Sequence, residues 1–261
     1  MGVLDDIVAG VRLDVQAREA LLTRGDLEAR LDQVSSPLDP MPAFRAPGLA
    51  VIAEVKRRSP SKGALADIPD PAQLAAGYET GGAAAISVLT EERRFGGSLT
   101  DLDAVRARVR IPVLRKDFIV TEYQLVEARA HGADLALLIV AALGDDDLAR
   151  LHGLAIELGL TPLVEVHTVE EARRAVDLGA ELIGVNSRNL QTLEVDLDQF
   201  SRIAEHLPEG CVKVAESGIS GPEDAARFHR EGAQVLLVGE TLVRHSDPTG
   251  AVQALLRSIP S

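Results

Sequence analysis

The sequence predicts an α/β fold, a single (β/α)8 TIM barrel, and three observations carry that prediction. Eight short apolar runs alternate with eight longer stretches whose apolar residues recur at helical spacing. The runs are apolar nearly throughout, as in a parallel sheet covered on both faces. The length of 261 residues suits one such barrel. An open doubly wound sheet would carry a glycine-rich fingerprint after its first strand, where this chain has KRRSPSKG.

The eight strand–helix units follow one another in order along the chain. The expected strands lie at residues 49–55, 84–89, 111–114, 135–140, 161–166, 182–185, 212–215 and 235–238. The expected helices lie at residues 71–80, 99–109, 121–131, 145–158, 169–178, 196–206, 221–230 and 249–257. Glycine commonly ends a helix, and four of the expected helices end at Gly132, Gly159, Gly179 and Gly232.

Residues 1–48 contain no strand pattern and precede the first unit. Their apolar residues recur at helical spacing between Leu4 and Val15, a second helical piece is expected near residues 27–34, and a proline-rich stretch follows. We therefore expect an N-terminal helical extension over residues 1–48 and a catalytic barrel over residues 49–261, forming one domain overall. The residues alone leave open whether the extension plugs the bottom of the barrel, packs on its side or covers the active face.

Composition and charge exclude several classes of protein. The apolar fraction of 46% argues against a disordered chain, and no apolar run approaches the roughly 18 residues of a membrane helix. The 27 basic and 40 acidic residues give a net charge of −13, which disfavours nucleic acid and anionic membranes as partners. The single cysteine, Cys211, excludes an internal disulfide, and the N-terminus lacks the pattern of a secretory signal. We therefore expect a cytoplasmic protein.

Charged and polar residues gather where the expected strands end, which is where reactive groups lie in barrels of this type. Glu54 and Lys56 share one face of the first strand, because strand side chains alternate. The polar residues at the strand ends are Glu54, Lys56, Lys116, Glu165, Asn186, Arg188 and Glu216.

Each of these residues also has a structural interpretation. Glu54 and Lys56 could form an ion pair that caps the barrel core, and Lys116 could be a surface lysine. The chain has only four lysines, however, and two of them meet three glutamates on one predicted rim. Buried charges of this kind are costly unless they are paired or used. The pattern therefore favours catalysis, whereas Lys213, near the start of the seventh strand, is expected to be structural.

The turns after the seventh and eighth strands read ESGIS (216–220) and VGETL (238–242). Each places a glycine just before an expected helix, where backbone N–H groups and the helix dipole can hold a phosphate. Because the first strand neighbours the eighth in a closed barrel, Ser59 can join this site, with Arg58 or Lys62 as counter-charge. The structural alternative is that these are two ordinary strand–helix turns that bind no ligand.

Eight segments, taken together, resemble the indole-3-glycerol-phosphate synthase family of tryptophan biosynthesis. The matching segments are VIAEVKRRSPSKG (51–63), SVLTEERRFGGS (87–98), VLRKDFI (113–119), LLIVAAL (137–143), LVEVH (163–167), IGVNSRNL (183–190), VAESGI (214–219) and LLVGETLV (236–243). The first 48 residues match more loosely and are similar to the family's extra helical segment, which lies over the active face.

The resemblance implies a carbon–carbon lyase, more closely a carboxy-lyase. It would convert 1-(2-carboxyphenylamino)-1-deoxyribulose 5-phosphate to indole-3-glycerol phosphate, CO2 and water. Lys116 would be the leading general acid for ring closure, and Glu165 would transfer a proton during dehydration. Lys56 would pair with the substrate's carboxylate or carbonyl region, and Glu54 would hold the lysines in place. The sequence leaves open which lysine donates which proton.

The resemblance also implies how the rest of the substrate would be held. Asn186 and Arg188 would orient the intermediate, and Glu216 would hydrogen-bond a hydroxyl group. At position 240 some relatives carry a hydroxyl residue, so Glu240 should contribute its backbone N–H with its side chain turned away from the phosphate. The remaining substrate-binding residues are Ser59, Ser217, Gly218 and Gly239 for the phosphate and Phe95, Phe118 and Leu137 for the aromatic ring.

Other functions are less consistent with the sequence. Phosphoribosylanthranilate isomerase would need a different acid–base pair, and a Schiff-base aldolase usually places its lysine where this chain has Asn186. A non-catalytic phosphate-binding barrel is the alternative outside enzymes, and the intact Lys56, Lys116 and Glu165 argue against it. No metal or dinucleotide motif is visible, so we expect no cofactor. We also expect a monomer with a phosphorylated small-molecule substrate.

Overall fold

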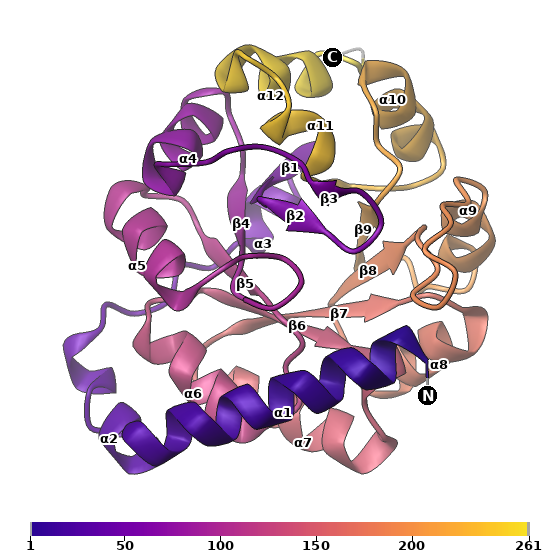
Figure 1. Cartoon of the computed structure of the whole chain (residues 1–261). Helices are drawn as coiled ribbons and strands as arrows, with labels where there is room; N and C mark the ends of the chain where they lie inside the picture. The colour runs from indigo at the N-terminus through magenta and orange to yellow at the C-terminus, as the bar shows by residue number, and fades with distance from the viewer. Residues whose placement is uncertain (1, 260–261) are drawn as a thin grey trace.

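The chain folds into the predicted barrel. The computed structural model describes residues 2–259, and its eight parallel strands close in the order β1-β10-β9-β8-β7-β6-β5-β4, with β4 pairing back onto β1 (Figure 1). The barrel strands are β1 (Ala50–Val55), β4 (Ala85–Leu89), β5 (Val113–Lys116), β6 (Leu135–Ile139), β7 (Thr161–Val166), β8 (Leu182–Asn186), β9 (Val212–Glu216) and β10 (Val235–Val238). The predicted (β/α)8 fold class is therefore confirmed.

Helices surround the barrel and connect its strands. They are α4 (Pro71–Thr80), α5 (Leu99–Arg108), α6 (Glu122–Ala130), α7 (Asp145–Glu157), α8 (Val169–Asp177), α9 (Gln199–Ala204), α10 (Pro222–Arg230) and α12 (Pro248–Leu256). Most begin at a side-chain cap; for example, the Thr121 hydroxyl accepts a hydrogen bond from the Gln124 backbone N–H. None of the helices within residues 2–259 is long and apolar enough to cross a membrane.

Two expected elements begin or end two or more residues from their expected positions, for local reasons. β5 starts at Val113 rather than at residue 111, because Pro112 has no N–H to give to the sheet. α9 is shorter than residues 196–206, since Asp196 donates its backbone N–H to Ser187 and Val195 pairs with Arg188. These contacts bind the start of the segment to the loop after β8 instead of to a helix.

Several short elements lie outside the eight strand–helix units, and among them only the helix start after Gly239 was anticipated from the sequence. A two-stranded hairpin, β2 (Arg58–Ser59) and β3 (Gly63–Ala64), follows β1, and the 3-10 helix η2 (Val140–Ala142) follows β6. The short helix α11 (Glu240–Val243) directly follows β10 with Gly239 at its N-cap. An extra helix at this position is common in phosphate-binding barrels.

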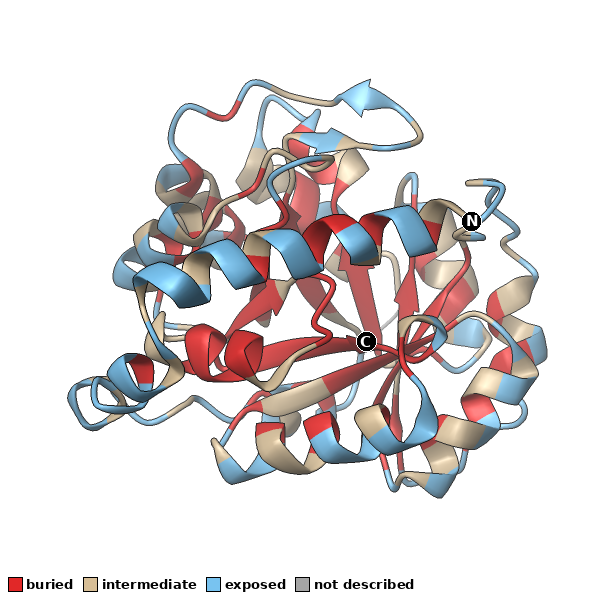
Figure 2. Cartoon of the chain, turned by 60° about the horizontal axis from the view of Figure 1, so that its bottom comes forward, coloured by how far each residue is buried: buried red, intermediate tan, exposed pale blue. Residues whose placement is uncertain are grey.

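The N-terminal extension is dominated by the long helix α1 (Val3–Leu21). It crosses one side of the barrel in front of α6 and α7 (Figure 1). It presents its buried residues toward the barrel and its exposed ones outward (Figure 2). The second helical piece is divided into α2 (Arg24–Glu28) and η1 (Leu31–Gln33), and α3 (Met41–Phe44) follows. α2 starts earlier than expected, because Thr23 and Asp26 form a capping box.

Candidate active site

A cavity of about 840 Å³ opens at the C-terminal ends of the strands. The residues that the sequence suggested for catalysis or substrate binding line it together, although they come from segments spread over almost 190 positions. These residues are Glu54, Lys56, Ser59, Phe95, Lys116, Phe118, Leu137, Glu165, Asn186, Arg188, Glu216, Ser217, Gly218, Gly239 and Glu240. The exception is Arg58, which is exposed on β2, whereas the alternative counter-charge, Lys62, lines the cavity.

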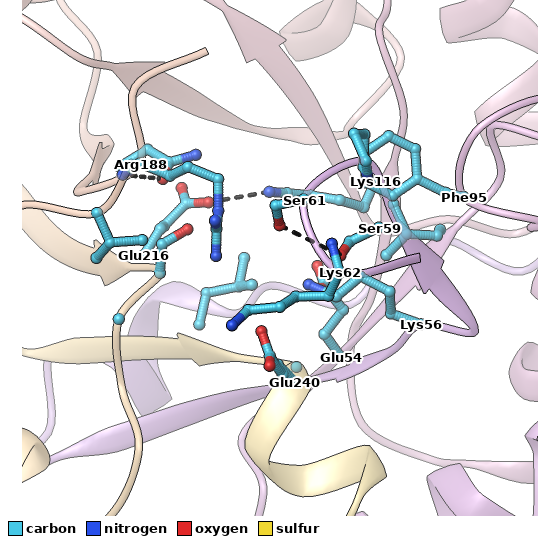
Figure 3. Close-up of a pocket in the computed structure, with 18 of the residues that line it drawn as sticks. Glu54, Lys56, Ser59, Ser61, Lys62, Phe95, Lys116, Arg188, Glu216 and Glu240 are labelled. Carbon is cyan, nitrogen blue, oxygen red and sulfur yellow. Dashed lines mark hydrogen bonds and ion pairs between the residues drawn. The ribbon is translucent and has the colours of Figure 1, made fainter. Parts of the chain in front are cut away.

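Lys116 lies at the end of β5 between two carboxylates from across the barrel. Its Nζ donates a hydrogen bond to Glu216 Oε2 at 2.9 Å (Figure 3) and another to Glu165 Oε2 at 3.2 Å. The other oxygen of Glu165 accepts a hydrogen bond from Asn186 Nδ2 at 3.2 Å. Gly184 on β8 leaves room for this cluster, because a Cβ there would lie 2.0 Å from Glu216 Oε1.

The cluster perturbs the protonation of all its members. Burial alone would lower the pKa of Lys116, but Glu216, Glu165 and Glu54 raise it above its usual value. Burial and the charge of Glu165 raise the pKa of Glu216 to about 8, against the opposing effect of Lys116. Burial would raise the pKa of Glu165 as well, yet Lys116 and His167 hold it well below its usual range. The surroundings therefore favour a charged Lys116, an ionised Glu165 and a proton on Glu216.

A second lysine, Lys56, is paired within its own segment. Its Nζ lies 2.6 Å from Glu54 Oε1, and Ser87 donates a hydrogen bond of 3.4 Å to the other oxygen of Glu54. Burial would raise the pKa of Glu54, but the charges of Lys56 and Lys116 lower it. The contacts of Lys116 are thus with Glu165 and Glu216, and the direct contact of Glu54 is with Lys56.

The strand that carries Lys116 is fixed from behind by a fully buried arginine. Arg115 donates hydrogen bonds to Thr90 Oγ1 at 3.2 Å, to the Gln124 carbonyl at 2.8 Å and to Asp117 Oδ2 at 3.0 Å. It also forms an ion pair of 2.9 Å with Glu127 Oε2. Neighbouring side chains on a strand point to opposite faces, so these contacts hold β5 while Lys116 points inward. The sequence signal was an arginine directly after an apolar run and next to Lys116.

The turn after β9 has an unusual backbone. Ser217 adopts a φ of 67° and Gly218 a φ of 78°, a region that side chains other than glycine seldom occupy. At Gly218 a Cβ would lie 2.3 Å from Leu197 Cδ2. The following helix begins only at Pro222, so Gly218 lies in the turn itself and not at the helix cap that the sequence suggested.

Residues from two further segments, the β2–β3 hairpin and α11, line the cavity together with this turn. The Ser59 hydroxyl accepts a hydrogen bond of 3.2 Å from the backbone N–H of Lys62 in the hairpin. Glu240 does not turn away from the cavity. Its carboxylate points toward the Lys62 side chain (Figure 3), and its charge is balanced by Arg244 Nη1 at 3.2 Å.

Part of the cavity wall is apolar. The rings of Phe95 and Phe118 lie 6.1 Å apart, and Leu137 continues the same wall. Glu91 positions this region, because its carboxylate accepts a hydrogen bond of 3.0 Å from the Phe95 backbone N–H. Three residues of α1 that the sequence did not assign to the site also line the cavity: Val3, Leu4 and Ile7.

Arg188 is held at the end of β8. Its backbone N–H donates to Asn186 Oδ1 at 3.0 Å, and its Nη1 donates to the Leu193 carbonyl at 2.9 Å.

Another polar residue, His167, lies directly behind Glu165 and was not assigned a role from the sequence. Its signal was the alternation Glu165–Val166–His167, which brings both polar side chains to one face. Within residues 2–259 no His, Cys, Asp and Glu side chains are grouped as a metal site.

The family model described as indole-3-glycerol phosphate synthase matches residues 4–255, nearly the whole chain. The chain belongs to the indole-3-glycerol phosphate synthase family. The family expected from the sequence motifs is therefore confirmed, and with it the expectation of a lyase of the carboxy-lyase class.

Relatives of the same family name are similar over nearly their full length. An indole-3-glycerol phosphate synthase from a Nocardioides species is 68% identical, covering 98% of this chain and 98% of the relative. The one from Mycolicibacterium gilvum is 61% identical over 97% of this chain and 93% of the relative. Indole-3-glycerol phosphate synthase 1 from Streptomyces coelicolor is 60% identical over 98% and 95%.

Solved structures extend the likeness to the fold alone. The 3-hexulose-6-phosphate synthase of Salmonella typhimurium aligns with a TM-score of 0.67 over 80% of this chain and 98% of that one, at 14% identity. The thiamine phosphate pyrophosphorylase of Pyrococcus furiosus aligns with a TM-score of 0.61 over 80% and 95%, at 18% identity. Identities this low show a shared barrel and carry no assignment of site residues.

Proposed function

We propose that the cavity closes the indole ring of indole-3-glycerol phosphate, with Lys116 as the general acid. The substrate is 1-(2-carboxyphenylamino)-1-deoxyribulose 5-phosphate, and the products are indole-3-glycerol phosphate, CO2 and water. The observation that carries the proposal is Lys116 Nζ, which points into the cavity within 3.2 Å of both Glu165 and Glu216. An ammonium held from two sides is positioned to donate a proton at one fixed point.

Ring closure is the step that needs this acid. The ring carbon that bears the carboxylate attacks the ketose carbonyl carbon, and the carbonyl oxygen takes up a proton as the new C–C bond forms. Lys116 supplies that proton, because its carboxylate neighbours keep it charged at neutral pH. The apolar wall of Phe95, Phe118 and Leu137 holds the aromatic ring and excludes water from it.

Decarboxylation follows, and the electrons of the C–C bond to CO2 restore the aromatic ring. Lys56 also lines the cavity, and Glu54 is its ion-pair partner within residues 2–259. It pairs with the substrate's carboxylate or carbonyl region until CO2 leaves. Glu54 holds Lys56 in the required direction.

Dehydration then removes the former carbonyl oxygen as water, which requires an acid and a base. Glu165 transfers the proton in this step, because it is the carboxylate that stays ionised. Asn186 donates to Glu165 and orients the intermediate together with Arg188. Glu216, protonated near neutral pH, donates a hydrogen bond to a hydroxyl of the substrate.

The phosphate occupies the end of the cavity formed by the turns after β9 and β10 and by the hairpin. Ser217, Gly218, Gly239 and the backbone N–H of Glu240 provide donors, and the hydroxyl of Ser59 completes the ring of contacts. Lys62 and Arg244 supply local positive charge to an otherwise acidic protein. The strained φ of Ser217 fits a backbone shaped for a ligand.

The proposal includes a monomer that needs no cofactor and acts in the cytoplasm. One chain supplies every residue to which we assign a role. Loss of CO2 and water involves no net oxidation, so the reaction does not call for a redox group. The one thiol, Cys211, is buried and free, which suits a reducing compartment.

Turnover of the purified protein tests the function directly. The protein is incubated with the carboxyphenylamino ribulose phosphate, and the fluorescence of the new indole ring is followed. Dialysed enzyme in excess chelator should keep its full rate. Absence of indole formation would reject the function, and a rate lost to chelator and restored by one metal ion would reject the cofactor-free mechanism.

A further inference from the structure

Two buried carboxylates share one ammonium group in the cavity. Glu165 and Glu216 are 2% and 1% exposed, and both lie within 3.2 Å of Lys116 Nζ. Carboxylates this close do not readily ionise together, so one of them holds a proton near neutral pH. The proposed mechanism needs the ionised one to be Glu165. The surroundings of the two carboxylates must therefore differ.

The difference lies in the groups around the oxygens that face away from Lys116. Glu165 Oε1 accepts a hydrogen bond from Asn186 Nδ2 and lies 3.2 Å from His167 Nε2, at ion-pair distance without the alignment of a hydrogen bond. Glu216 Oε1 is buried and has no hydrogen-bond partner within residues 2–259. Only Glu165 thus has a second cationic group available to stabilise its charge.

His167 is itself built to hold a positive charge. Its Nδ1 lies 3.3 Å from Glu171 Oε2, and its backbone N–H donates to the same oxygen at 2.7 Å. Glu171 belongs to the first turn of α8, and its backbone N–H is capped by the Thr168 hydroxyl. The imidazole is therefore placed between two carboxylates, one on each ring nitrogen.

Within residues 2–259, Glu165 and Glu171 are the charged groups that act on the ring. From α9, the neutral Gln199 side chain donates a hydrogen bond of 2.9 Å to the His167 carbonyl, and β8 contributes the neutral Asn186. The charged groups that face the ring are Glu165 of β7 and Glu171 of α8. Burial alone would lower the pKa of His167, but these two carboxylates raise it to about 9.

We propose that His167, as an imidazolium, is a positioning residue that selects which carboxylate holds the shared proton, keeping Glu165 ionised and the proton on Glu216. It lies behind Glu165 and outside the residues that line the cavity, so it acts through Glu165 and does not touch substrate. When Lys116 gives its proton to the substrate, His167 continues to neutralise Glu165. The inference rests on the proposed function, in which Glu165 is the proton-transfer group.

The pH dependence of His167→Gln tests the inference. Glutamine keeps a donor near Glu165 but removes the positive charge, which raises the pKa of a neighbouring carboxyl group. The variant should then lose activity at pH 6.5 by about ten-fold or more, because one pKa unit changes the ionised fraction about ten-fold. Near pH 9.5 its kcat should return to within about three-fold of wild type, since both carboxylates are ionised there.

Two further variants separate charge from packing. His152→Gln removes another buried histidine, on α7 and remote from the cavity, and should leave the kcat–pH profile unchanged. Glu171→Gln removes one of the two charges that stabilise the imidazolium and should lower the pKa of His167. A loss of kcat in His167→Gln that is equal at every pH would overturn the inference, because a merely structural role predicts that result.

Nitrogen-15 spectra of the wild-type protein give an answer that does not depend on how the variant folds. With labelled histidine, the signals of His167 are identified by comparison with the variant or with Glu171→Gln, whose His167 signals should shift. We expect both ring nitrogens to remain protonated through pH 8. A neutral ring at pH 7 would overturn the inference. If the wild type forms no indole, the proposed function fails, while this spectrum still reports the charge of His167.

Discussion

The two lysines of the cavity differ in how they are held. Lys116 ends β5 and is bound by two carboxylates that reach it from β7 and β9. Lys56 follows β1 and is bound by a single carboxylate from its own strand, at 2.6 Å. Their side chains are similarly shielded, 13% and 19% exposed, so burial does not distinguish them.

Because Lys116 and Lys56 differ in their number of carboxylate partners, we expect them to have different roles. A lysine fixed from two sides has one direction in which to deliver a proton, and its partners can receive the proton back during the next steps. A lysine with one partner keeps donors free for a substrate anion. The comparison therefore identifies Lys116 as the acid and Lys56 as the anchor, a distinction that residue type and position along the strands do not give.

The largest effect should come from Lys116→Met. Loss of a positioned general acid typically costs about 10²–10⁴-fold in rate, and kcat should fall by that amount. Binding of a phosphate-containing product should change far less, because the phosphate turns lie on other strands. The variant leaves Glu165 and Glu216 without their counter-charge, so circular dichroism and product binding must show that it is folded.

Lys213→Met is the matched control for that variant. Lys213 lies on β9, where its Nζ donates to the Ala204 carbonyl at 3.0 Å, and it does not line the cavity. Its kcat should remain within about two-fold of wild type. An equal loss of kcat in both variants would mean that the effect of Lys116→Met comes from stability and not from proton transfer.

Lys56→Met should have the next largest effect and a different character. A hydrogen bond to a charged group contributes about 1.5–3 kcal/mol, so kcat/KM should fall by about ten-fold to one hundred-fold, with KM rising. Steady-state kinetics at saturating substrate separates this from the loss in kcat expected at Lys116. A Lys56 variant with unchanged KM and a kcat reduced by about 10³-fold would reverse the two assignments.

Gly239→Ala should disturb the Glu54–Lys56 pair and leave the hydrogen bonds of Lys116 intact. A Cβ at this position would lie 2.4 Å from Glu54 Oε1 and 3.1 Å from Lys56 Nζ. KM should therefore rise by roughly ten-fold, through the loss of a contact worth about 1.4 kcal/mol, and kcat should fall less. Gly153→Ala, in open space on α7, is the control and should leave both constants unchanged. An unchanged KM in Gly239→Ala would show that the Glu54–Lys56 pair does not contribute to substrate binding.

The smallest effect is a change in how stability depends on pH. The pKa of Glu216 is raised from 4.5 to about 8 in the folded protein, so this group stabilises the fold fully below about pH 4.5. That contribution is lost as the pH rises through about 8. Glu216→Gln cannot ionise, so its Tm should fall less than that of wild type between pH 5 and pH 8.5. Parallel Tm profiles for the two proteins would show that Glu216 is already ionised at neutral pH.

The sequence alone was enough to predict the barrel and the main polar and apolar residues that line the cavity. Alternation of apolar runs and helical stretches predicted every barrel strand, and strand-end positions converge on one rim whatever the details of packing. This is why Glu54, Lys116 and Glu165, far apart along the chain, could be placed together from the residues alone.

Contacts across the barrel could not be predicted in the same way. Whether Lys116 meets Glu54 or meets Glu165 and Glu216 depends on the strand register and on room left by Gly184, which a linear pattern does not encode. The wall contributed by α1 depends on how that helix packs over the barrel. The role of His167 was missed because it depends on a contact with Glu171, four residues further along the chain.

The most direct test of the account is the kcat of Lys116→Arg, measured beside Lys116→Met at one pH with saturating substrate. Arginine keeps the positive charge between Glu165 and Glu216 but does not readily give up a proton. If Lys116 is the general acid, the arginine variant should recover little and remain about 10²-fold or more below wild type. A kcat near wild type would contradict the account, leaving Lys116 as an electrostatic anchor and Lys56 as the better candidate for the acid.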